Sequence, residues 1–212
     1  MIFNGVSSVS TGIIIFYILI GIICVIYFAY KITGVIRQKR KLTIGHEAEM
    51  AVGQELNELM RDGAWVFHDF PADEFNIDHI VVSTKGVLAI ETKGRSKPTD
   101  GNGKSTAWEV IYDGMSLAFP GWTETEPIAQ AERQAKWLQR WLTSAVGEPV
   151  TVKPILVLPG WFVKLANPKG IFVFNGKKPQ VLFQYGQDVL SPTLINRIVH
   201  QIDQRCRNIK PT

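Results

Sequence analysis

The clearest pattern in the chain is a long apolar run near its N-terminal end. Residues 13–30 read IIIFYILIGIICVIYFAY, and no Lys, Arg, Asp or Glu occurs before Lys31. As a helix this run would rise about 27 Å, close to the thickness of a bilayer's hydrocarbon core. The run shows no polar face of the kind that an amphipathic core helix carries. It therefore predicts a transmembrane helix over about residues 13–30, within an N-terminal segment 1–30.

The flanks of the run distinguish an anchor from a cleaved signal peptide. A signal peptide would carry a basic start and a small-residue cleavage site, and neither is present here. Segment 31–43 instead follows as a basic juxtamembrane linker that contains Lys31, Arg37, Lys39, Arg40 and Lys41. Basic residues collect on the cytoplasmic side of a membrane and contact anionic head groups. We therefore expect a single-pass protein of the cell membrane whose globular part lies in the cytoplasm.

Beyond residue 43 the pattern becomes that of a mixed α/β domain. Helical spacing of apolar residues predicts three helices, at about residues 43–61, 127–145 and 191–207. Runs rich in β-branched residues predict strands at 64–70, 77–83, 87–93, 151–158, 170–175 and 181–184, with another short strand in AWEVIYDG, residues 107–114. The order α-β-β-β-α-β, followed by smaller elements, indicates a mixed sheet flanked by helices.

Charge changes this picture in one respect. The chain carries 23 Lys and Arg residues against 19 Asp and Glu, for a net charge of +4. Five of the basic residues lie in segment 31–43, which leaves 18 Lys and Arg against 19 Asp and Glu for residues 42–212, a net charge of −1. The globular part therefore lacks the bulk positive charge of many nucleic-acid binders, and any such binding requires a local patch. The simpler interpretation of the basic residues near the second helix, which we favour, is a solvated face. The candidates for a phosphate-facing patch are Arg95, Lys97, Lys104, Arg133, Lys136 and Arg140.

The cysteine content excludes one class of site. The two cysteines, Cys24 and Cys206, lie far apart in the sequence, and no CxxC motif is present. This pattern suits a reducing compartment and excludes a cysteine-built zinc site.

Three charged residues interrupt the predicted hairpin NIDHIVVSTKGVLAIETKGR, residues 76–95. Glu91 and Lys93 share one face of their strand because side chains alternate. A two-residue loop between the strands places Asp78 on that same face, whereas a three-residue loop would place it on the other. His79 then points to the opposite face, where we expect it to be packed or hydrogen-bonded.

Two interpretations of this charged face remain open from the residues alone. Lys93 could form a plain ion-pair cluster with Asp78 and Glu91. Alternatively, the two carboxylates could bind Mg²⁺ or Mn²⁺, which prefer oxygen ligands. Such a cation activates water and stabilises charge on a phosphoryl oxygen, and a nearby Lys can assist.

The hairpin resembles the core of the NERD (nuclease-related) domain, within the PD-(D/E)xK nuclease superfamily. The superfamily motif, an Asp on one strand and E-x-K on the next, is matched by Asp78 and by Glu91-Thr92-Lys93. The first-helix pattern of the family is matched in GHEAEMAVGQEL by Gly45, Glu49, Val52 and Leu56. The Glu follows Ala48 instead of Gly, and the N-P-x-x-Q sequence appears as EPIAQ, with Pro127 and Gln130 retained.

The resemblance implies a restriction-endonuclease-like αβββαβ core and a set of site residues. Asp78 and Glu91 would be the metal ligands for Mg²⁺ or Mn²⁺, and Lys93 would act on the attacking water or on the transition state. Glu49 would complete the metal shell through water or orient Lys93. Gln130 would approach from its helix, and Gln134, one turn later on the same face, is the alternative.

These expectations divide the chain into four parts and suggest a function. Residues 1–30 carry the transmembrane helix, 31–43 form the linker, 44–160 form the NERD-like nuclease core, and 161–212 complete the domain with strands and a helix. The expected activity is metal-dependent hydrolysis of phosphodiester bonds in nucleic acid, with DNA favoured over RNA. The alternative is a catalytically silent scaffold that binds a partner or nucleic acid at the membrane.

Overall fold

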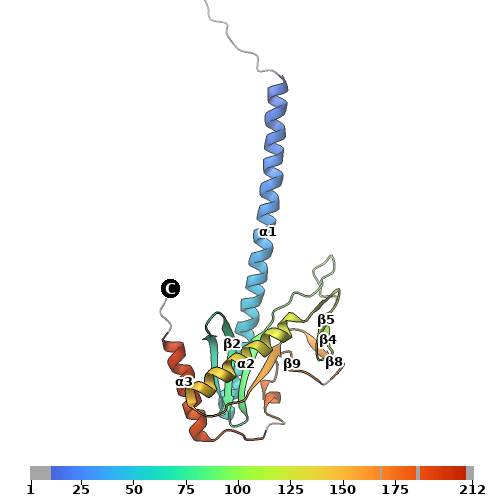
Figure 1. Cartoon of the computed structure of the whole chain (residues 1–212). Coiled ribbons are helices and arrows are strands. Elements are labelled where there is room, and N and C mark those ends of the chain that lie inside the picture. The colour runs from blue at the N-terminus through green and yellow to red at the C-terminus, as the bar shows by residue number, and fades with distance from the viewer. Residues whose placement is uncertain (1–10, 168, 185–186, 209–212) are drawn as a thin grey trace, which may run out of the picture. The chain divides into compact units, whose positions relative to one another are not determined.

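The computed structural model describes residues 11–167, 169–184 and 187–208 of the chain. Its contacts divide the chain into two compact units, Met1–Thr43 and Ile44–Thr212. Helix α1, Thr11–Asn57, includes both the apolar run and the start of the second unit (Figure 1). Segment 31–43, which we expected to be a linker, is therefore helical. It contains no proline, and its Lys, Arg and Gln residues are good helix formers.

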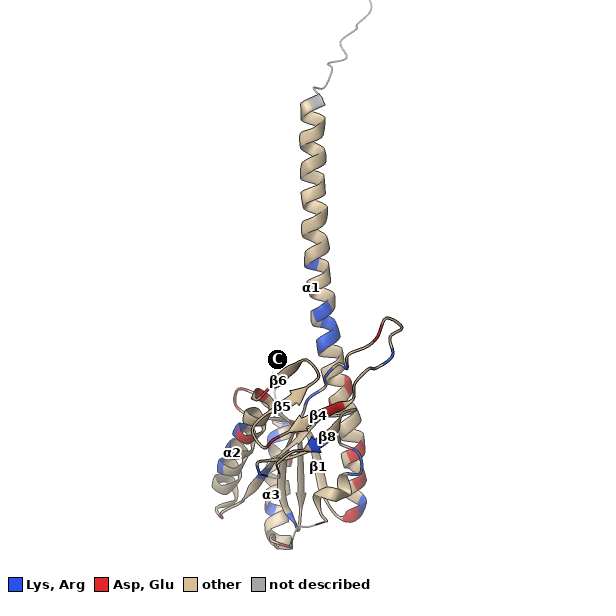
Figure 2. Cartoon of the chain, turned by 90° about the vertical axis from the view of Figure 1, so that its right-hand side faces the viewer, with Lys and Arg blue, Asp and Glu red and all other residues tan. Residues whose placement is uncertain are grey.

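The N-terminal part of α1 is a candidate membrane span. It is long and apolar enough to cross a membrane, judged by its length and composition, and its most apolar window has a mean hydropathy of 2.8 with none of that window buried. Its Lys and Arg residues follow the apolar stretch, which carries no charge (Figure 2). Exposed apolar surface of this extent requires a partner or a membrane to cover it.

The second unit is built on a five-stranded mixed sheet with the order β1-β2-β3-β7-β9. Strands β1 to β3 are antiparallel, whereas β3, β7 and β9 run parallel. The strands are β1 (Trp65–Pro71), β2 (Asn76–Ser83), β3 (Gly86–Thr92), β7 (Val152–Val157) and β9 (Phe172–Phe174). The expected mixed sheet flanked by helices is confirmed.

A second sheet of four strands was not predicted as such from the sequence. Its order is β6-β5-β4-β8, with β4 and β8 parallel. The strands are β4 (Glu109–Tyr112), β5 (Leu117–Phe119), β6 (Trp122–Glu124) and β8 (Phe162–Leu165). Each is only three or four residues long, so hydrophobic alternation gives little signal. The predicted strand at 181–184 is wrong, because η2 (Pro179–Leu182) forms a 3-10 turn that starts with a proline.

Helices cover both faces of the five-stranded sheet. Helices α2 (Glu126–Val146) and α3 (Pro192–Arg207) pack on one face, where Leu138, Leu142 and Ile198 are fully buried against strand residues. The end of α1 and the turn η1 (Glu58–Asp62) pack on the other face through Leu56 and Leu59. The Ser191 hydroxyl caps α3 by accepting from the Leu194 amide at 3.2 Å, which supports the predicted helix start.

The β2–β3 hairpin has the register on which the candidate site depends. His79 pairs with Ile90 and Ser83 pairs with Gly86, so the loop is the two-residue Thr84-Lys85. In the same register Asp78 lies opposite Glu91, and cross-strand partners share a face. The two-residue alternative is therefore the one that the structure adopts, with Asp78, Glu91 and Lys93 on one face.

Tryptophans concentrate in the second unit, which contains all six of the chain's indoles. Trp137 and Trp141 on α2 lie parallel, with ring centroids 6.2 Å apart. The guanidinium of Arg205 on α3 lies 5.1 Å and 5.3 Å from these two rings and also forms an ion pair with Asp73. This contact ties α3 to α2 and to the β1–β2 turn.

Candidate functional site

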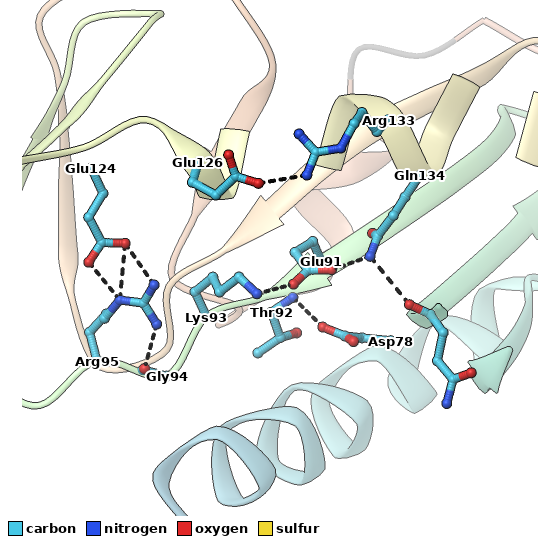
Figure 3. A network of polar contacts seen from close by, with 11 residues as sticks. Asp78, Glu91, Thr92, Lys93, Gly94, Arg95, Glu124, Glu126, Arg133 and Gln134 are labelled. Carbon is cyan, nitrogen blue, oxygen red and sulfur yellow. Dashed lines mark hydrogen bonds and ion pairs between the residues drawn. The ribbon is translucent and has the colours of Figure 1, made fainter. Parts of the chain in front are cut away.

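The candidate site is centred on Glu91, near the end of β3. Its side chain is buried, with 2% of its surface exposed. One carboxylate oxygen forms an ion pair with the Lys93 ammonium, and the other accepts a hydrogen bond from Gln134 Nε2 at 2.6 Å (Figure 3). Glu91 is therefore held from two sides by donors, as a buried charge requires.

Asp78 approaches Glu91 from the neighbouring strand. Its Oδ2 accepts a hydrogen bond from the backbone amide of Thr92 at 2.7 Å (Figure 3). Burial, and secondly the negative charge of Glu91, raise the pKa of Asp78 to about 7. The effect of the amide bond opposes this increase but does not cancel it. Two carboxylates thus share a site in which a single ammonium group, that of Lys93, forms an ion pair with Glu91.

Glu49 reaches this region from α1. Burial, followed by the charges of Asp69 and Glu91, raises the pKa of Glu49, while His46 and Lys93 lower it. The approach of α1 to β3 requires Gly94, because a Cβ at that position would lie 2.5 Å from the Ile44 carbonyl oxygen. The glycine directly after the E-T-K sequence therefore allows the helix that carries Glu49 to pass close to the strand end.

Helix α2 contributes Gln134 to this cluster. Gln134 is buried, and its Nε2 also donates to the Asn76 carbonyl at 3.3 Å. Within the described part of the chain, no hydrogen bond joins Gln130 to Asp78, Glu91 or Lys93. The structure thus brings the alternative glutamine, and not the expected Gln130, into contact with Glu91. Helical spacing places Gln130 and Gln134 on one face of α2, but only the packing of α2 on β3 decides which of the two side chains reaches Glu91.

Two of the six basic residues considered for a phosphate patch, Arg95 and Arg133, form ion pairs. Arg95 forms a forked pair with Glu124, with nitrogen–oxygen distances of 2.7–3.2 Å (Figure 3). Trp122 donates a further hydrogen bond to the same carboxylate at 2.8 Å. Arg133 pairs with Glu126 at 2.6 Å. The charges of Arg95 and Arg133 are therefore balanced by protein carboxylates.

The donor set fits a small divalent cation. Asp78 and Glu91 supply hard oxygen ligands, and the one ammonium group that forms an ion pair with either of them among the described residues is that of Lys93, with Glu91. The described residues contain no group of three or more His, Cys, Asp or Glu side chains arranged to hold a metal. Mg²⁺ commonly uses one or two carboxylates and retains water in its other positions. The pair therefore suits that type of ion and not a metal that needs an all-protein cage.

Two buried polar atoms near Glu91 lack a hydrogen-bond partner among the described residues. They are Oγ1 of Thr92 and Oε1 of Gln134. Buried polar atoms are usually satisfied by protein or by ordered water. Gln134 Oε1 belongs to the amide that donates to Glu91, so an ordered water can be bound beside that carboxylate. The Thr92 side chain alternates to the other face of β3.

Of three comparisons with known proteins, one gives a match, to a family profile. No curated protein and no solved structure gives a significant match. The profile of the nuclease-related domain, NERD, matches residues 44–159, which include all of the elements from the end of α1 to β7. Since this match covers more than half of the chain, the protein belongs to the NERD (nuclease-related domain) family.

Proposed function

We propose that this protein is a metal-dependent nuclease that hydrolyses phosphodiester bonds, with DNA as the favoured substrate. The observation that carries the proposal is the cluster of Asp78, Glu91 and Lys93 on one face of β2 and β3. A purely structural ion pair would need one carboxylate for one ammonium group. The second carboxylate, the half-buried Asp78, accepts a backbone amide but has no ion-pair partner among the described residues, which leaves it available to a cation.

Each residue of the cluster has a distinct task in this proposal. Asp78 and Glu91 would hold Mg²⁺ or Mn²⁺, which supplies positive charge to the phosphate and acidifies the attacking water. The Lys93 ammonium, 22% exposed, would orient the water or balance charge that develops on the phosphate oxygens. Gln134 would keep Glu91 in its orientation. Glu49 would add a carboxylate at the outer edge of the site.

The proposal also places this activity at a membrane. The apolar part of α1 would span the cell membrane once, and the basic residues after it would lie on the cytoplasmic side. The nuclease-related unit would then face the cytoplasm, where Mg²⁺ and nucleic acid are both present.

The direct test uses the full chain in detergent micelles with labelled single-stranded and double-stranded DNA and RNA. With Mg²⁺ or Mn²⁺ we expect cleavage, and we expect Asp78→Ala and Glu91→Ala each to lower the rate about a hundredfold or more. The Asp100→Ala variant, which changes an exposed loop carboxylate, serves as a control that should retain activity. Equal inactivity of the wild type and both site variants on every substrate would refute the catalytic proposal.

A second candidate function is a non-catalytic scaffold that binds a partner or nucleic acid. The ion pairs Arg95–Glu124 and Arg133–Glu126 favour it, because they reduce the positive charge that nucleic-acid substrates require. Thermal unfolding with added Mn²⁺ separates the two functions. A cation site should raise the melting temperature, and Asp78→Asn should abolish the increase. The scaffold predicts no increase at millimolar Mn²⁺.

A further inference from the structure

A small pocket is lined in part by Glu49, the α1 carboxylate whose pKa responds to the charges of Glu91 and Lys93. It has a volume of about 180 Å³. Its walls come from α1 on one side and from β1 and β2 on the other, and it is lined by His46, Glu49, Met50, His68, Asp69 and His79. Since Glu49 also interacts with Glu91 and Lys93, the pocket and the proposed phosphate site are neighbours.

Asp69 enters this pocket through an unusual backbone conformation. Its φ angle is 50°, although it lies within β1 and is not a glycine. The pairs on either side, His68–His79 and Phe70–Ile77, would place Asp69 opposite Asp78 in an unbroken ladder. The left-handed backbone instead directs Asp69 to the pocket wall beside Glu49. Such conformations are costly outside glycine and concentrate at functional sites.

A buried histidine forms the inner wall. His79 is 3% exposed, and its Nδ1 lies 2.8 Å from Nδ1 of His68. The other ring nitrogen, Nε2, makes no hydrogen bond of normal geometry among the described residues, although the Glu49 backbone lies close to the ring. Both imidazole rings pack against Gly53 of α1, where a Cβ would lie 3.3 Å from each ring. The pocket thus combines flat ring surfaces, one unsatisfied polar atom and two carboxylates.

These properties select the ligand by size and by hydrogen bonding. The volume is below the roughly 300–1,000 Å³ of sites for drug-sized ligands, so a single ring system fits better than a whole nucleotide. Ring faces and the Met50 thioether suit a flat, polarizable ligand. Carboxylates repel phosphate, but they accept from N–H groups. A nucleobase with an exocyclic amino group has the required flat shape and N–H donors.

We propose that this pocket receives one unstacked, amino-bearing nucleobase from the strand whose phosphate is bound at Glu91 and Lys93. The inference rests on the proposed function, since it places the base in the pocket that Glu49 lines and its phosphate at the neighbouring Glu91 cluster. A base can enter only if it leaves its stack. The substrate is therefore single-stranded or has a base flipped out of the duplex.

The test measures binding of deoxyguanosine monophosphate, thymidine monophosphate and inorganic phosphate by calorimetry. It uses the wild-type full chain in detergent with Mg²⁺, because none of these ligands contains a phosphodiester bond that the proposed nuclease could cleave. We expect the guanine nucleotide to bind at least tenfold more tightly than phosphate or the thymine nucleotide, because thymine presents carbonyl oxygens on both sides of its one N–H. Equal affinity for all three ligands would overturn the proposal.

Two matched tryptophan variants examine the pocket itself. Met50→Trp fills it from the exposed side of α1, and Met60→Trp changes a methionine of equal exposure, 53% against 54%, outside the pocket. We expect Met50→Trp to lose tenfold or more in affinity for the guanine nucleotide, and Met60→Trp to bind normally. Normal binding by Met50→Trp would refute the pocket.

A third variant and a cleavage assay keep the two proposals separable. Asp69→Gly relieves the backbone strain and removes the carboxylate, so it should be at least as stable as the wild type yet lose the preference for guanine over thymine. Retained preference in Asp69→Gly would contradict the inference. If DNA is cleaved but the nucleotides bind equally, only the base pocket fails. If the nucleotides discriminate as expected and nothing is cleaved, only the nuclease fails.

Discussion

Asp78 is the residue whose chemistry depends most on its surroundings. Its carboxyl group is half-buried opposite Glu91, and desolvation together with the charge of Glu91 raises its pKa to about 7. In the folded protein without a cation, Asp78 therefore keeps its proton to a higher pH than in the unfolded chain. The protonated Asp78 carboxyl group contributes fully to the free energy of unfolding below about pH 4. This contribution is lost as the pH rises through 7, where the group ionises in the folded protein.

This linkage predicts the behaviour of Asp78→Asn in metal-free buffer. The variant cannot ionise, so its stability relative to the wild type should increase from pH 5 to pH 8. Burial lowers the pKa of His79 to about 4 and also lowers that of His68, which makes both proteins less stable in acid. Comparing the two proteins by urea unfolding cancels that shared effect. A difference that does not change with pH would contradict the assigned shift.

Gln134 provides a second prediction at the level of single residues. Replacing it with Ala leaves Glu91 without the amide donor, so the free energy of unfolding should fall by about 1–3 kcal/mol. Gln130→Ala, four residues earlier on the same helix, should change it by about 0.5 kcal/mol or less. Urea unfolding of both variants at pH 7 measures the difference. Equal effects would mean that the hydrogen bond to Glu91 does not stabilise the site.

Strand parity made three of these side chains predictable from the sequence. A two-residue loop and the alternation of a strand suffice to bring Asp78, Glu91 and Lys93 together. The choice between Gln130 and Gln134 was not predictable, because both lie on one helix face and only the packing of α2 on β3 selects a turn. Asp69 was missed because alternation assumes extended backbone, which its φ of 50° does not have.

At the scale of elements, the crossing of α1 and β3 depends on one glycine. A Cβ at Gly94 would lie 2.5 Å from the Ile44 carbonyl oxygen and 2.9 Å from the Ala48 Cβ. Neither contact can be relieved by rotating a flexible side chain. The helix that carries Glu49 would therefore have to move away from the strand that carries Glu91.

Gly94→Ala is accordingly expected to lower stability by about 1–3 kcal/mol, and to lower cleavage activity more than stability alone explains. The matched control is Gly101→Ala, since an added Cβ at Gly101 meets no atom within 4 Å. Thermal unfolding and cleavage rates of both variants test this. Wild-type behaviour of Gly94→Ala would show that the two elements can separate without cost.

The elements differ in how far the sequence reveals them. The long strands and helices carry enough periodic residues to be located, and Ser191-Pro192 marks the start of α3. The second sheet is held by pairing between short strands far apart in the chain, such as β4 with β8. Residues 181–184 are rich in residues that favour strands, yet Pro179 and the neighbouring core hold this region as a turn.

At the scale of the whole molecule, the two units carry different kinds of surface. Side chains in residues 12–43 are exposed, and the run 13–30 is entirely uncharged, whereas the second unit has its own buried core. We therefore expect the full chain to sediment with membranes and to resist extraction by alkaline carbonate. A chain consisting of residues 44–212 should instead remain in the supernatant. Release of the full chain by carbonate would contradict a membrane-spanning helix.

The placement of the indoles gives this molecule a convenient optical property. All six tryptophans belong to the second unit, and Arg205 lies beside the rings of Trp137 and Trp141. Excitation at wavelengths that only indole absorbs will therefore report on the nuclease-related unit without background from the apolar helix, even in lipid. Unfolding measurements can thus be made on the intact protein in vesicles, and detachment of α3 should be visible as a change in emission.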